Sequence, residues 1–106
     1  MTEALACDII QRALASLRER NALPSVDLPP VTLIPLEGGR GYLTYVAAEL
    51  AEAAEAADIP NVSVEGLAST LARYLAEVVD IVPAYSDITR VELRNDGAIL
   101  LYLRPD

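Results

Sequence analysis

The sequence predicts an α+β domain in which three helices pack on a small, mostly antiparallel sheet with a C-terminal β-hairpin. Two observations carry this prediction. Apolar residues recur at spacings of three and four in residues 4–20, 42–57 and 64–79, which is typical of amphipathic helices. Two strand-like stretches, 88–94 and 98–103, flank a turn sequence. Together these elements form a two-layer domain.

The first predicted helix ends before a proline-rich loop. Asn21 can end this helix, and Pro24 cannot continue it. The loop at 22–30 leads into a short strand at 31–36. Because Pro35 has no N–H to donate, this strand should lie at an edge of the sheet or end there.

A glycine-rich connector at 37–41 leads into the second helix, which we expect to begin at Tyr42. Its Gly-Gly-Arg-Gly sequence resembles a phosphate cradle at a helix start, but a flexible connector explains the glycines as well. The third helix has Ser63 as its expected N-cap and Glu65 in its first turn.

The C-terminal part of the chain predicts a hairpin. Residues 81–87 fit either a short extended segment or a loop. Residues 88–94 alternate between apolar and polar side chains, which indicates a half-buried strand. Asn-Asp-Gly at 95–97 predicts the turn. The returning strand, 98–103, is almost continuously apolar and should be central.

Composition limits the possible partners. The chain has 106 residues, which fit one domain (1–106), and a net charge of −8. An acidic protein is repelled by phosphate backbones and by anionic membranes. We find neither a signal-peptide pattern nor a run of 18 apolar residues, and therefore expect a cytoplasmic protein that does not enter membranes.

The residue types also limit catalysis. All eight basic residues are Arg, so there is neither Lys nor His, and Cys7 is the single cysteine. Histidine-assisted nucleophiles, a phosphate-binding lysine loop and zinc sites are thereby excluded. Glu49, Glu52 and Glu55 could form a carboxylate pair in a cleft, although a solvated helix face explains them better. We expect no enzyme activity, no cofactor and no metal.

Two stretches resemble the N-terminal additional domain of arginyl-tRNA synthetases, and the resemblance covers most of the chain. In that family a helix opens with Gly-Asp-Tyr-Ala-Thr-Asn-Val-Ala-x-x-Leu-Ala, which the segment 42–51 follows with Tyr, Thr, Val, Ala, Leu and Ala in place. The family's last strand reads Gly-Phe-Ile-Asn-Phe-x-Leu, and 97–103 keeps the Gly, the Ile and the final Leu. The resemblance implies the same fold and a role in recognising the tRNA D-loop.

The departures from the family affect the base-reading positions. The family's Asp before Tyr42 is Gly41 here, and its helix Asn is Tyr45. Its strand Phe and Asn are Ala98 and Leu100, which can neither stack on a base nor bond to its edge. The synthetase signatures His-Ile-Gly-His and Lys-Met-Ser-Lys-Ser are impossible in a chain without His or Lys. The resemblance thus implies a non-catalytic, free-standing relative or a fragment.

Two hypotheses for function follow. We favour a protein-interaction or assembly module, with a protein partner or a homodimer bound at an apolar patch. The patch would be formed by Tyr45, Ala98, Leu100 and Tyr102, provided that these side chains are exposed. The alternative is a tRNA-binding accessory domain. The candidate phosphate contacts are Arg40, Arg90, Arg94 and Arg104, and Tyr42 and Tyr45 stand beside the glycine connector. An Arg-lined sheet face near the hairpin would favour RNA, and an apolar one a protein.

Overall fold

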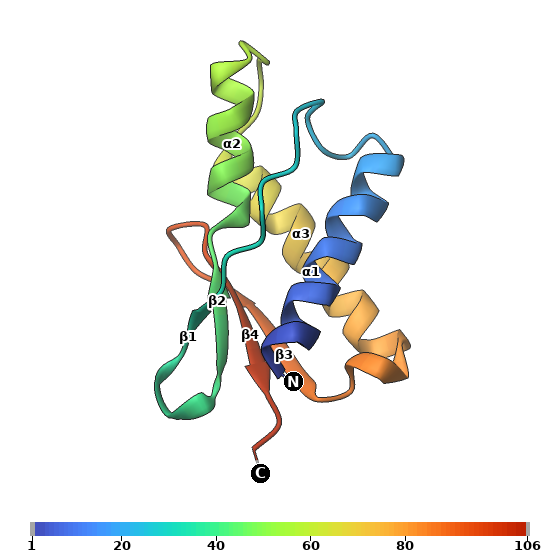
Figure 1. Cartoon of the computed structure of the whole chain (residues 1–106). Coiled ribbons are helices and arrows are strands. Elements are labelled where there is room, and N and C mark those ends of the chain that lie inside the picture. Colours follow the sequence, from blue (N-terminus) through green and yellow to red (C-terminus); the bar gives the residue numbers. More distant parts are fainter. Residues whose placement is uncertain (1, 106) are drawn as a thin grey trace.

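The computed structural model describes residues 2–105 of the chain. It contains the helices α1 (Thr2–Glu19), α2 (Val46–Ala56) and α3 (Val64–Ile81) and two single 3-10 turns, η1 (Glu37–Gly39) and η2 (Pro83–Tyr85). The strands are β1 (Ile34–Pro35), β2 (Gly41–Thr44), β3 (Ile88–Leu93) and β4 (Ile99–Leu103). They form one antiparallel sheet in the order β1-β2-β4-β3, which confirms the predicted α+β class and the C-terminal hairpin (Figure 1).

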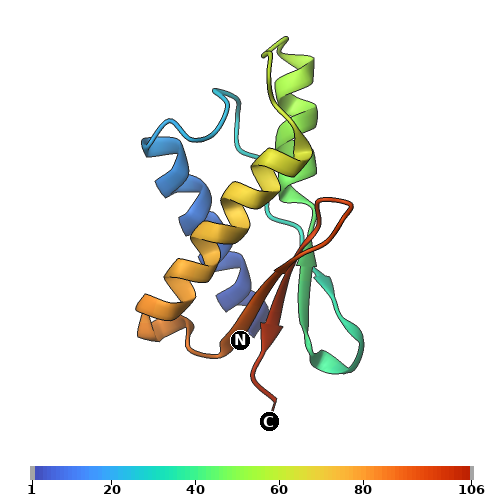
Figure 2. The same cartoon turned by 180° about the vertical axis from the view of Figure 1, so that it is seen from behind.

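The helices cover one face of the sheet. On β4, Ile99 and Leu101 are fully buried in the main core with the apolar faces of the helices. Because successive side chains of a strand point to opposite faces, Leu100 and Tyr102 point the other way. The two views in Figures 1 and 2 show α1 and α3 on the same side of the β3–β4 hairpin, with α2 continuing upward from β2. We call the uncovered side the open face.

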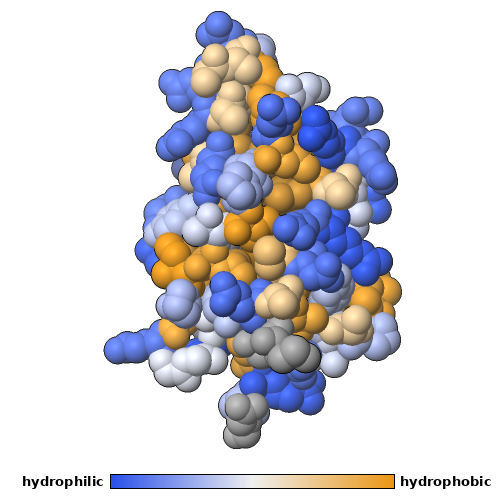
Figure 3. All heavy atoms as spheres, viewed as in Figure 1, coloured by the Kyte–Doolittle hydropathy of each residue, from blue (hydrophilic) through white to orange (hydrophobic). Residues whose placement is uncertain are grey.

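The main core draws on every helix. It includes Ile9 and Leu14 from α1, Leu50 from α2, and Leu71 and Leu75 from α3, all of them buried. The loop between α1 and β1 crosses the front of the molecule between α1 and α2 (Figure 1). Several of its apolar side chains pack against this core. Figure 3 shows hydrophobic residues in the middle of this side of the molecule, with hydrophilic residues over α1.

The predicted start of the second helix was wrong. Tyr42 to Thr44 belong to strand β2, and the helix begins at Val46, whose N–H donates to Thr44 Oγ1 at 3.3 Å. β2 pairs with residues 99–102 of β4, with Tyr42 opposite Leu101. Close pairing requires Gly41, because a Cβ there would lie 2.0 Å from the Leu101 carbonyl oxygen. Pairing with the sheet decides the conformation of this segment, which its own pattern does not.

The ends of the other elements agree with the sequence in part. The strand predicted at 31–36 is only two residues long, Ile34–Pro35, and it is an edge strand as Pro35 requires. Ser63 caps α3 by accepting a hydrogen bond from the Gly66 N–H at 3.0 Å, and β4 is central. The ambiguous segment 81–87 contains the end of α3 and the turn η2. Within residues 2–105 no helix is long and apolar enough to cross a membrane.

Candidate functional site

A second, smaller apolar cluster lies on the open face. Its buried members are Leu43, Ala98 and Leu100, and half-buried side chains surround them. Leu43 of β2 lies directly opposite Leu100 of β4. Ala98 is fully buried and Leu100 is 7% exposed. The two strands therefore bury each other's apolar side chains on the face without helices.

The condition for the predicted apolar patch fails for two of its four residues. Ala98 and Leu100 are buried, so neither presents a contact surface to a partner. The reason is β2, which the sequence analysis had assigned to a helix and which places Leu43 over them. Tyr45 and Tyr102 pack against the edge of this cluster and stay half-exposed. What remains is two separate tyrosines instead of a continuous apolar patch.

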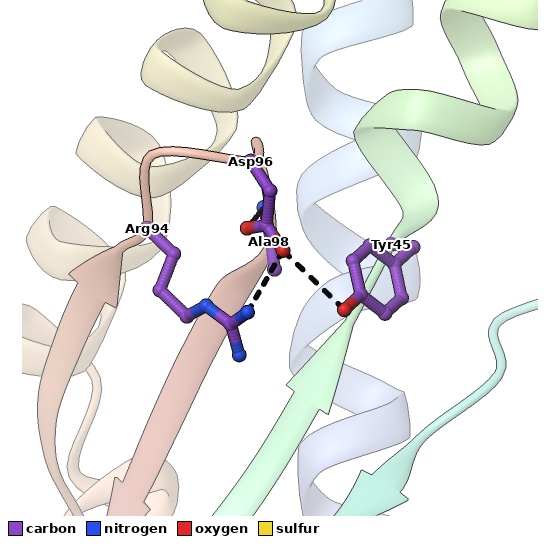
Figure 4. A network of polar contacts seen from close by, with 4 residues as sticks. All are labelled: Tyr45, Arg94, Asp96 and Ala98. Carbon is purple, nitrogen blue, oxygen red and sulfur yellow. Dashed lines mark hydrogen bonds and ion pairs between the residues drawn. The ribbon is translucent and has the colours of Figure 1, made fainter.

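The side chain of Asp96 stabilises the hairpin turn through hydrogen bonds (Figure 4). Its Oδ1 accepts the Ala98 N–H at 3.1 Å, which closes the turn. Its Oδ2 accepts a hydrogen bond from Arg94 Nη2 at 2.9 Å and a longer one, 3.5 Å, from the Tyr45 hydroxyl. Figure 4 shows the Arg94 and Tyr45 side chains converging on this carboxylate from β3 and from the start of α2. Arg94 is thus already paired with a carboxylate.

At the opposite end of the sheet the open face is hollowed by a groove of about 800 Å³. We call it the arginine groove. The Gly38–Gly39 turn and Arg40 line it from the β1–β2 connection, Arg90 from β3, and Tyr102 and Arg104 from β4. The register explains this convergence, because Arg90 and Gly41 both lie opposite Tyr102. Three of the eight arginines thus meet in one place.

Protein contacts hold two of these arginines. Arg104 Nη2 donates to the Ser86 carbonyl oxygen at 3.0 Å. The Arg90 guanidinium stacks on the Tyr102 ring, with Cζ 4.4 Å from its centre, and Arg90 Nη2 lies 2.7 Å from Glu92 Oε2. The exposed Arg40 side chain forms no hydrogen bond or ion pair with any other residue between 2 and 105.

The charge in the groove is one-sided. Among the lining residues that the structure describes there are three arginines and no carboxylate, in a protein whose net charge is −8. Glu92 partly offsets Arg90 from beside the groove, and Arg40 and Arg104 have no such partner in the described part of the chain. A guanidinium presents paired N–H donors that match phosphate and carboxylate oxygens. The groove is therefore suited to an anion that also offers a flat surface to Tyr102.

A third polar cluster joins α1 to η2. The Tyr85 hydroxyl donates to Asp8 Oδ2 at 2.7 Å, and the Arg12 guanidinium lies 5.8 Å from the ring centre. Burial raises the pKa of Tyr85, and the hydrogen bond to Asp8 acts in the same direction. Tyr85 is only 3% exposed, so its hydroxyl is not accessible to a ligand, and its bond to Asp8 ties two elements together.

The predicted site residues divide into four groups, and Leu100, buried in the small apolar cluster, forms one of them. Arg40 and Tyr102 lie in the arginine groove. Tyr45, Arg94 and Ala98 belong to the turn network at the other end of the face. Tyr42 packs against the main core on the helix-covered face.

The sequence indicates Arg90 and Arg104 only as possible phosphate contacts, and it is the strand register that brings them together with Tyr102. The glutamates at 49, 52 and 55 lie along α2, and no three His, Cys, Asp or Glu side chains of residues 2–105 are placed to hold a metal ion.

Comparisons of the chain with protein-family models, with curated proteins and with solved structures found no match. The resemblance to the arginyl-tRNA synthetase domain therefore rests on the two motif stretches alone.

Proposed function

We propose that this chain is a non-catalytic RNA-binding module that holds unpaired RNA, such as a tRNA loop, in the arginine groove. The observation that carries the proposal is the meeting of Arg40, Arg90 and Arg104 around Tyr102, with no carboxylate among the lining residues between 2 and 105. Single-stranded nucleic acids are bound in this way, by cations that follow the phosphates and by an aromatic ring on which a base stacks.

The same geometry weakens the protein-partner hypothesis. That hypothesis required Ala98 and Leu100 to be exposed, and both are buried. An Arg-lined sheet face near the hairpin would favour RNA. The strands of the hairpin meet this criterion only at the end nearer the Gly38–Gly39 turn, whereas the end near the hairpin turn has its arginine paired with Asp96.

The net charge of −8 is compatible with a local RNA site. The acidic residues Glu49, Glu52 and Glu55 lie on α2, which rises from the end of β2 away from the groove (Figure 1). Negative charge elsewhere on the surface repels phosphates and so restricts binding to the groove. We therefore expect weak, salt-sensitive binding at one site.

The proposal is tested by fluorescence anisotropy with labelled bulk tRNA at several salt concentrations. We expect saturable binding whose affinity falls with salt, with a log–log slope of about −2 because three arginines each contribute ~0.7 on single strands. Arg40→Glu should weaken binding by about tenfold or more, since it replaces a cation by a repelling charge. It should not unfold the domain, because Arg40 is exposed and its side chain makes no polar contact in the described part of the chain.

The matched control is Arg73→Glu, which makes the same change of charge on an exposed position of α3, in the helical layer. It should leave the affinity nearly unchanged. The proposal is wrong if tRNA fails to bind at low salt, or if the two variants weaken binding equally. Equal weakening would mean that only the net charge matters.

A further inference from the structure

The outer edge of β3 is open. β3 is the last strand of the sheet and pairs only with β4. The helical layer covers its inner side incompletely: Val91 packs against the main core but is only half-buried, and Leu93 is 43% exposed although its partner Ile99 is fully buried. Strand edges carry unpaired N–H and C=O groups that can pair with another strand.

Charge normally protects such edges, but here the charges alternate in sign. Arg90 and Glu92 follow each other along the open-face side of β3, with exposed side chains that also pair within the chain. A second copy that pairs antiparallel around Val91 would place Arg90 opposite Glu92 of the second copy, and Glu92 opposite Arg90 of the second copy. Opposite charges in directly facing positions stabilise an antiparallel pair.

Other registers are unfavourable. A register centred on Glu92 would place Glu92 opposite Glu92 of the second copy and Arg90 opposite Arg94 of the second copy. Like charges would then face each other across the interface. A slip by a single residue moves the apolar side chains to the wrong face. The charge pattern of β3 therefore selects the register centred on Val91.

The favoured register also covers apolar surface. Val91 would face Val91 of the second copy on the inner side, with Leu93 diagonally across from it, within reach of a side chain of that size. The bulge between Ile88 and Arg90 limits regular pairing to the part of the strand after it. The contact is thus short, and the complex it forms is weak.

We propose that the chain forms a homodimer by antiparallel pairing of β3 with β3 of a second copy, in the register centred on Val91. The two sheets join into one, and the two arginine grooves open on the same face. This interface does not depend on RNA binding, and it uses the strand edge instead of the apolar patch that the sequence suggested.

The test is sedimentation equilibrium of the full chain from micromolar to millimolar concentration. We expect a reversible monomer–dimer equilibrium for the wild type. Glu92→Arg places like charges face to face twice in each dimer, and it should raise the dissociation constant by more than about tenfold. The double exchange Arg90→Glu with Glu92→Arg restores opposite charges and should restore the dimer. Glu52→Arg on the exposed side of α2 is the control and should dimerise like the wild type.

Glu92→Arg also separates this proposal from the RNA proposal, because it adds positive charge beside the groove: RNA binding should be at least as strong as in the wild type, while dimerisation is weakened. Hydrogen exchange of the wild type gives a measurement that needs no variant: the edge amides of β3 should become more protected as protein concentration rises. A wild type that stays monomeric without such protection, a dimer that survives Glu92→Arg, or a double exchange that stays monomeric would overturn the proposal.

Discussion

The guanidinium of Arg90 lies on the ring of Tyr102, with its central carbon 4.4 Å from the ring centre. The two residues face each other across β3 and β4 on the open face. An arginine over an aromatic ring at an exposed site contributes about 0.5–1 kcal/mol. The contact is therefore modest in stability, but it holds a cation and a flat ring together at the arginine groove before any ligand arrives.

Tyr102 should contribute to RNA binding through its ring. Tyr102→Ala should weaken tRNA binding roughly tenfold, because stacking of one base contributes about 1–3 kcal/mol. Tyr102→Phe keeps the ring and should bind like the wild type. Anisotropy titrations of the three proteins check this prediction, and an unchanged affinity of Tyr102→Ala would contradict it.

Arg94 should matter much less for RNA than Arg40. Its guanidinium is paired with Asp96 at 2.9 Å, so its charge is already compensated, and it lies at the other end of the face from the groove. Arg94→Glu should lower the affinity for tRNA clearly less than Arg40→Glu. It should also lower the melting temperature slightly, since exposed ion pairs contribute about 0–1 kcal/mol and the new carboxylate would stand beside Asp96. A loss of affinity as large as that of Arg40→Glu would extend the RNA site to the turn.

The parts of the fold that depend on local sequence could be predicted. Periodicity placed the three helices, Ser63 marked the start of α3, and Pro35 marked an edge strand. One pair of residues in the arginine groove could also be predicted. Counting outward from the Asn-Asp-Gly turn sets Arg90 opposite Tyr102, as the register has it.

The parts that depend on pairing between distant segments could not be predicted. Nothing between Tyr42 and Thr44 distinguishes a strand from the first turn of a helix, and it is pairing with β4 that makes it a strand. Missing β2 had a direct consequence for the site, because Leu43 buries Ala98 and Leu100. The groove was missed as a whole for the same reason: β2 brings Arg40 beside Arg90, Tyr102 and Arg104, which lie far from it in the sequence.

Gly97 should be among the residues least tolerant of substitution. It has φ +85°, and a Cβ there would lie 2.4 Å from Val64 Cγ1 at the start of α3. Gly97→Ala should cost about 2–5 kcal/mol, the sum of a left-handed backbone and an overpacked contact. Gly39 has a similar φ of +68°, but no atom lies within 4 Å of a Cβ added there. Gly39→Ala should therefore cost only about 1–2 kcal/mol. Urea unfolding measures both. Adding Val64→Ala to Gly97→Ala should recover part of the difference, and equal costs for the two alanines would show that the contact is unimportant.

The bond between Tyr85 and Asp8 should make stability depend on pH in the alkaline range. Tyr85→Phe removes a 2.7 Å hydrogen bond to a carboxylate and should lower the free energy of unfolding by roughly 1–3 kcal/mol at neutral pH. Burial and this bond raise the pKa of Tyr85 above its usual value of 10.0, so the folded protein keeps the phenol proton at a pH where the unfolded chain loses it. The stabilisation is therefore complete below pH 10 and is lost as the pH rises through the folded-state pKa.

The measurement is urea unfolding of the wild type and Tyr85→Phe at a series of pH values from neutral to above 10. The gap between their free energies of unfolding should be constant at neutral pH and should shrink above pH 10, because only the wild type can lose this phenol proton on unfolding. Tyr74→Phe is the control, since it removes a phenol from α3 and leaves the bond to Asp8 in place. A gap between wild type and Tyr85→Phe that widens with pH would mean that the folded state favours the charged form of Tyr85, opposite to what its burial requires.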